Sequence, residues 1–115
     1  MCNEDLVNEL LQKLSVYAQD IFGDKLKRVV LYGSYARGDY DEESDIDVML
    51  MVDLSPDELN LYRKQINDFC ADLNVENSVF ISPMLQSESM FDEWKDTLPF
   101  YQNIILEGIN VYKPA

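Results

Sequence analysis

Two neighbouring motifs contain residue types suited to phosphate and metal chemistry. The first begins with Gly33 and Ser34, directly after an apolar run that has strand character. Glycine there lets the backbone approach a ligand closely, successive amides can point at phosphate oxygens, and the Ser34 hydroxyl adds a donor. Arg37 can reach the same anion if the loop coils into a helical turn. The motif predicts a phosphate site, although the glycine and serine alone also suit a plain turn, and Arg37 could pair with acidic neighbours.

The second motif places Asp45 and Asp47 two residues apart in a run with strand character. Period-two alternation puts both carboxylates on one face, while Ile46 and Val48 point to the other. Two adjacent carboxylates repel each other unless a cation lies between them, and oxygen ligands on a rigid strand suit magnesium. Such a pair beside a phosphate-binding loop is typical of phosphoryl or nucleotidyl transfer, whereas alone it could be a solvated edge strand.

Ser44 stands immediately before this pair. We expect it to orient the aspartate loop through a backbone hydrogen bond rather than to contact substrate. The preceding acidic residues lack the ligand spacing of a calcium loop, and we interpret them as a solvated rim: Asp39, Asp41, Glu42 and Glu43.

Apolar periodicity indicates which elements position these motifs. It predicts a helix over 6–21, strands over 29–32 and 46–52, a helix over 55–73, a strand over 75–81, a helix capped by Thr97 and closed by Gly108, and an edge strand over 109–112. The strongest signal for the start of a helix is a capping serine, a first-turn proline and a capping-box glutamate, namely Ser55, Pro56 and Glu58. The order predicts an α/β (α+β) fold, a mixed sheet of three to four strands flanked by helices.

Length and charge limit the remaining possibilities. The chain has 115 residues, which suggests a single domain over 1–115, and its net charge of −13 disfavours binding long nucleic acid unaided. It contains no histidine, so any chemistry rests on carboxylates, hydroxyls, amides and a few cations. The sequence predicts a cytoplasmic protein for three reasons. It has only two cysteines, it shows no apolar leader, and its longest apolar run is far shorter than the ~20 residues that a membrane span needs.

The two motifs together resemble the signature of the DNA polymerase β-like nucleotidyltransferase superfamily. Within it, the sequence Gly-Ser-Tyr-Ala-Arg-Gly from position 33 and the short chain resemble the minimal nucleotidyltransferases, or MNT proteins. The resemblance implies that Gly33 and Ser34 bind the triphosphate and that Asp45 and Asp47 hold two magnesium ions. It also implies a third carboxylate on a neighbouring strand, which completes one metal site and helps to deprotonate the attacking hydroxyl. Glu76, near the start of the expected 75–81 strand, is the best placed acidic residue, although the family more often has aspartate there.

The resemblance implies an enzyme that transfers AMP from ATP to a hydroxyl group. We expect so short a chain to be nearly all catalytic core and to take its acceptor from a partner. MNT proteins often act as antitoxins of HEPN-domain ribonuclease toxins, so such a toxin is the expected partner and acceptor. Two alternatives stay open. One is a binding-only antitoxin with a vestigial site, and the other is transfer to a small molecule such as an aminoglycoside, for which a homo-oligomer could build the acceptor site.

Overall fold

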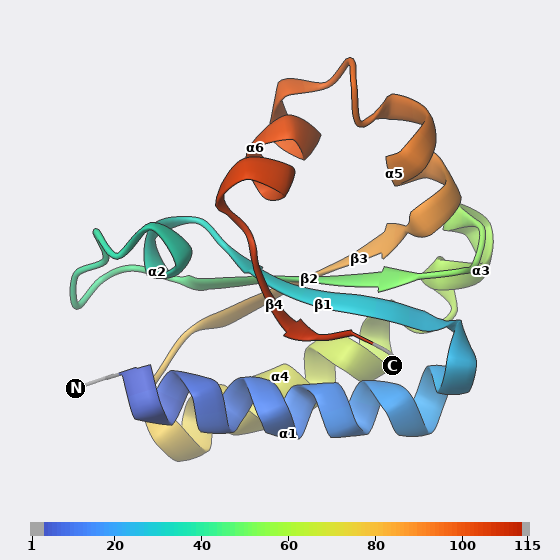
Figure 1. Cartoon of the computed structure of the whole chain (residues 1–115). Helices are drawn as coiled ribbons and strands as arrows, with labels where there is room; N and C mark the ends of the chain where they lie inside the picture. The colour runs from blue at the N-terminus through green and yellow to red at the C-terminus, as the bar shows by residue number, and fades with distance from the viewer. Residues whose placement is uncertain (1–3, 114–115) are drawn as a thin grey trace.

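A computed structural model of the chain describes residues 4–113. A four-stranded sheet lies between two helical layers, with α1 and α4 on one face and α5 and α6 on the other (Figure 1). The elements are α1 (Glu4–Phe22), the 3-10 turn η1 (Gly23–Lys25), β1 (Leu26–Tyr32), α2 (Ser34–Arg37), β2 (Ile46–Val52), α3 (Pro56–Asn60), α4 (Arg63–Asn77), β3 (Ile81–Ser87), α5 (Glu88–Trp94), α6 (Pro99–Glu107) and β4 (Ile109–Tyr112).

The sheet is mixed and has the strand order β3-β2-β1-β4. β1 runs antiparallel to both β2 and β4, whereas β2 and β3 are parallel. Asp47 lies opposite Tyr32 on β1 and opposite Ser82 on β3. The predicted α/β fold with a mixed sheet is therefore confirmed.

Alternation along the strands divides the core into two layers. The α1 and α4 face receives Val48, Leu50 and their neighbours, which pack with Leu10, Leu14 and Ile66. The α5 and α6 face has a smaller buried cluster, made of Val30, Met49, Met51, Phe91, Tyr101 and Ile104. Asp47 alternates with Val48 and shares the face of Met49, so its carboxylate lies on the α5 and α6 side of the sheet.

The predicted strand over 75–81 is wrong. α4 continues to Asn77, and the third strand begins only at Ile81. Ser78 ends the helix in the left-handed region with φ 54°. The Asn74 side chain then accepts a hydrogen bond from Ile81 N at 2.7 Å and donates to Ile81 O, which joins the helix end to the strand start. The short apolar run around Val75 belongs to the exposed helix end, where Val75 itself is 84% exposed.

Three smaller differences concern boundaries. The helix expected over 55–73 is two helices, because the chain turns between Asn60 and Arg63; the predicted capping box of Ser55 and Glu58 is present. α5 was not predicted, and the cap residue of α6 is Leu98 rather than Thr97. None of the helices in the described part of the chain has the length and hydropathy that a membrane span requires.

Candidate active site

The candidate site lies where β1 ends and β2 begins. Gly33 follows β1 with φ 75°, a backbone conformation that residues other than glycine rarely adopt. A β-carbon at Gly33 would collide with Oδ2 of Asp47, so the Asp47 carboxylate fills the space that a side chain would need. The glycine of the first motif and an aspartate of the second are thus in direct contact.

The loop after Gly33 coils into a single helical turn, which is the condition for Arg37 to reach an anion bound at Gly33 and Ser34. The Gly33 carbonyl accepts hydrogen bonds from the amides of Ala36 and Arg37, each at 3.1 Å. Gly38 ends the turn in the left-handed conformation with φ 85°. This turn, α2, carries Ser34 at its start and Arg37 at its end.

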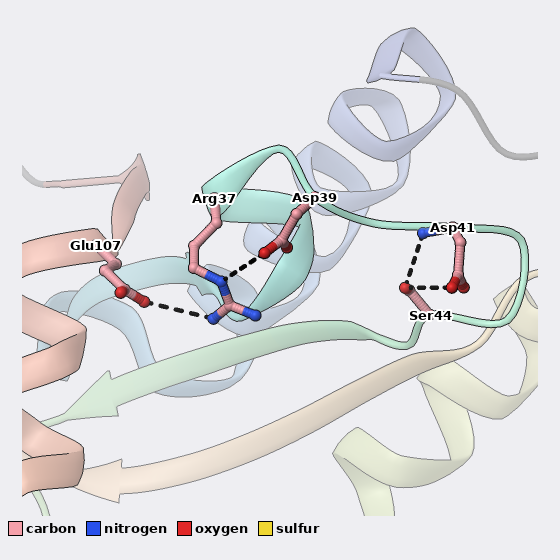
Figure 2. Close-up of polar contacts among 5 residues, drawn as sticks. All are labelled: Arg37, Asp39, Asp41, Ser44 and Glu107. Atoms are coloured by element: carbon pink, nitrogen blue, oxygen red, sulfur yellow. Dashed lines mark hydrogen bonds and ion pairs between the residues drawn. The ribbon is translucent and has the colours of Figure 1, made fainter.

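Arg37 extends from α2 between two carboxylates (Figure 2). Its Nε lies 3.2 Å from Asp39 Oδ2, and its Nη1 lies 3.4 Å from Glu107 Oε2 at the end of α6. The pair with Asp39 is the main reason that the pKa of the guanidinium is raised. Burial raises the pKa of Asp47 and the positive charge of Arg37 offsets part of that rise, which indicates that its charge acts on the site. Arg37 therefore pairs with two carboxylates and also acts electrostatically on Asp47.

The two aspartates differ in environment. Asp45 is exposed one residue before β2, whereas Asp47 is half-buried within it. Burial is the largest cause of a raised pKa at Asp47, and repulsion by Asp45 adds to it. Tyr32, opposite Asp47 on β1, has a raised pKa for related reasons, first its burial and then the negative charge of Asp47. The predicted repulsion between the two carboxylates is therefore present.

Ser44 holds the loop before the aspartates. Its hydroxyl accepts a hydrogen bond from the Asp41 amide at 3.0 Å and lies 3.2 Å from Asp41 Oδ1 (Figure 2). The Asp41 carboxylate in turn accepts from the Glu43 amide at 2.9 Å. The predicted backbone hydrogen bond of Ser44 is present, and one member of the acidic rim, Asp41, helps to shape the loop.

Glu76 does not join the site, which corrects its proposed position. It lies in the last turn of α4 rather than on a strand, on the sheet face opposite to Asp47, where it lines a groove with α1 residues. The residue of the neighbouring strand that lies opposite Asp47 is Ser82. Within residues 4–113, no three side chains of histidine, cysteine, aspartate or glutamate gather closely enough to hold a metal ion on their own.

Two further residues of the site were missed by sequence reasoning. Tyr32 is the last residue of β1, and its ring packs edge-on against Phe100 of α6 with centroids 5.7 Å apart. Its place directly before Gly33 was a usable signal. Glu107 pairs with Arg37 across 70 positions of sequence, and no local pattern points to that pair.

Comparison with known proteins agrees with this geometry. A family model described as a nucleotidyltransferase domain matches residues 9–98. The chain therefore belongs to the nucleotidyltransferase domain family. A candidate protein adenylyltransferase from Methanocaldococcus jannaschii is 36% identical over 88 residues, which are 76% of this chain and 80% of that relative.

Solved structures share the fold at low sequence identity. A chain of a toxin–antitoxin crystal structure with AMP-PNP aligns with a TM-score of 0.57 and 16% identity, over 89% of this chain and 73% of that one. A chain of the complex between the tri-AMPylated Shewanella oneidensis HEPN toxin and its MNT antitoxin aligns with a TM-score of 0.52 and 16% identity, over 93% of this chain and 73% of that one. The fold is thus that of MNT-like nucleotidyltransferases.

Proposed function

We propose that this chain transfers AMP from ATP to a hydroxyl group of a partner protein. The observation that carries the proposal is the contact between Gly33 and Asp47, which joins a backbone segment suited to phosphate to a half-buried carboxylate. Family membership supports nucleotidyl transfer, and the name of the M. jannaschii relative supports a protein as acceptor.

The triphosphate would lie against Gly33 and Ser34. The positive φ of Gly33 turns the chain from β1 into α2, and the Ser34 hydroxyl supplies a donor at the start of that turn. Arg37 would add positive charge on the same side. Its two ion pairs are exposed, and exposed pairs contribute only about 0–1 kcal/mol, so a phosphate could replace either carboxylate partner at little cost.

Asp45 and Asp47 are suited to bind magnesium, and in the proposed enzyme they would hold two magnesium ions. Their mutual repulsion and the raised pKa of Asp47 are what a cation between them would relieve. When bound, magnesium would neutralise phosphate charge and lower the pKa of the attacking hydroxyl. Ser44 would keep Asp45 and Asp47 in register through its hydrogen bonds to Asp41.

We further propose a HEPN-domain toxin as the acceptor protein, with this chain as its antitoxin. The fold shared with the complex of the S. oneidensis HEPN toxin and MNT antitoxin supports this partner class. The net charge of −13 also favours a basic, RNA-cutting partner, because opposite charges accelerate association.

The test mixes the purified chain and a HEPN-domain toxin with magnesium and ATP and measures the intact mass of the toxin. The expected result is a mass increase of one or more adenylyl groups, which is lost in the double variant Asp45→Asn with Asp47→Asn. An unmodified toxin in the presence of wild-type protein would contradict the proposal.

A binding-only antitoxin is the second candidate function. The observation that favours it is that Ser82 stands opposite Asp47 and that β3 contains no aspartate or glutamate to serve as a third carboxylate. In that case the double aspartate variant would still neutralise the toxin, and wild-type protein would leave the toxin mass unchanged. The same experiment thus separates the two functions.

A further inference from the structure

We propose that the seam between α1 and α4 is a docking site for a cationic amphipathic helix of a partner protein. The seam lies on the sheet face opposite to Asp47, so it is separate from the site of transfer (Figure 1). A groove of about 850 Å³ runs along it. The proposal goes beyond the transfer reaction and does not depend on it.

The floor of the groove is apolar. The rings of Tyr17 and Phe69 stack across the two helices with centroids 4.0 Å apart and an angle of 8° between their planes. Val16 lies beside them and is 56% exposed, while Leu73 is buried below. The exposed valine and the stacked aromatic pair together form an apolar surface, against which apolar side chains of a partner can be buried.

The rim of the groove is acidic. Its charged lining residues are four carboxylates and one lysine, namely Glu9, Asp20, Asp72, Glu76 and Lys13. An apolar floor between carboxylates matches a partner whose apolar stripe is flanked by lysine or arginine. A second copy of this chain would instead bring the same acidic rim to the same seam, and its own charge of −13 opposes that pairing.

The shape of the groove indicates a helix as occupant. On α1 the lining extends from Glu9 to Asp20, about 16 Å at 1.5 Å per residue, or three helical turns. On α4 the lining residues are spaced by three and four positions, from Phe69 to Glu76, so each helix presents one stripe to the seam. A third helix with apolar residues at i, i+3 or i+4, and i+7 can lie between two such stripes.

The probe is a fluorescein-labelled helical peptide of 14 residues with leucines at that spacing, lysines beside them and alanines elsewhere. Its control is a scrambled peptide of the same composition. Binding to the full chain is measured by fluorescence anisotropy with EDTA and without ATP, so the result is independent of the proposed transfer activity. We expect the patterned peptide to bind at least tenfold more tightly than the scrambled one, with affinity that falls as salt rises.

Matched variants locate the binding site. Val16→Gln with Asp72→Lys should weaken the patterned peptide at least tenfold. Leu106→Gln with Glu93→Lys makes the analogous aliphatic-to-amide and acid-to-lysine changes at exposed positions of α6 and α5 and should change affinity by less than twofold. Equal loss in both double variants, or equal binding of the scrambled peptide, would show that net charge alone attracts the probe and would overturn the proposal. So would a dimer in sedimentation that the Val16 and Asp72 changes dissociate, because the occupant would then be a second copy.

Discussion

Oδ2 of Asp47 occupies the space into which a side chain at Gly33 would project. The end of β1 and the start of β2 can approach this closely only because position 33 lacks a β-carbon. The same contact brings the phosphate motif against the carboxylate motif.

Gly33→Ala should destabilise the fold by more than the cost of its backbone conformation. Gly33 has φ 75° and ψ −153°, a backbone conformation essentially restricted to glycine, which costs an alanine roughly 1–3 kcal/mol, and the collision with Asp47 adds to that cost. Asp47→Ala removes the carboxylate that the added β-carbon would meet, so Gly33→Ala should cost less stability in the Asp47→Ala background than in the wild type. Urea unfolding of the four proteins measures the difference, and equal losses in the two backgrounds would mean that the Asp47 contact is unimportant.

Asp47→Asn should raise the stability of the metal-free protein at neutral pH. The pKa of Asp47 is raised above its usual 3.8, so the folded state binds the proton more tightly than the unfolded state. Protonation of Asp47 therefore adds to the free energy of unfolding. This stabilisation is fully present below the usual pKa and is lost as the pH rises through the raised pKa of the folded state. The advantage of the asparagine variant should therefore appear above the raised pKa and shrink below pH 3.8. Denaturant unfolding at a series of pH values measures it, and an advantage that is constant with pH would contradict the assignment.

Magnesium with ATP should raise the unfolding temperature, because the pair binds only the folded site. At a free ligand concentration one hundred times Kd, binding stabilises by about 2.7 kcal/mol. Asp45→Asn with Asp47→Asn should abolish the shift, and EDTA should remove most of it from the wild type. Differential scanning fluorimetry is sufficient, and a full shift in the double variant would exclude these aspartates as metal ligands.

Glu76→Gln should leave adenylyl transfer within about twofold of the wild type, because Glu76 lies on the opposite face of the sheet from Asp47. Asp47→Asn should reduce transfer by about a hundredfold or more, the scale at which loss of an essential acid–base group acts. Single-turnover assays with radiolabelled ATP and the toxin compare the two. A large loss in Glu76→Gln would mean that Glu76 acts in transfer or in binding of the toxin through the groove between α1 and α4.

Much of the candidate site could be predicted because its signals are local. Gly33 and Ser34 follow a strand, Asp45 and Asp47 keep strand spacing, and these short-range relations survive folding unchanged. The mixed sheet between helices was predictable for the same reason, since apolar periodicity reports which face of an element is buried. The capping box at Ser55 is equally local, and its hydrogen bonds are present.

The sequence by itself determined the local geometry of residues 33–47, because the turn after Gly33 and the spacing of Asp45 and Asp47 depend on neighbours a few positions away. Only the tertiary structure decided which distant side chains join them. Glu107 reaches Arg37 from 70 positions away, and Glu76 is carried to the opposite face because α4 extends to Asn77. A short apolar run near Val75 suits a strand or a helix end equally well. The hydrogen bonds of Asn74 to Ile81, which depend on how the helix packs against the sheet, decided between them.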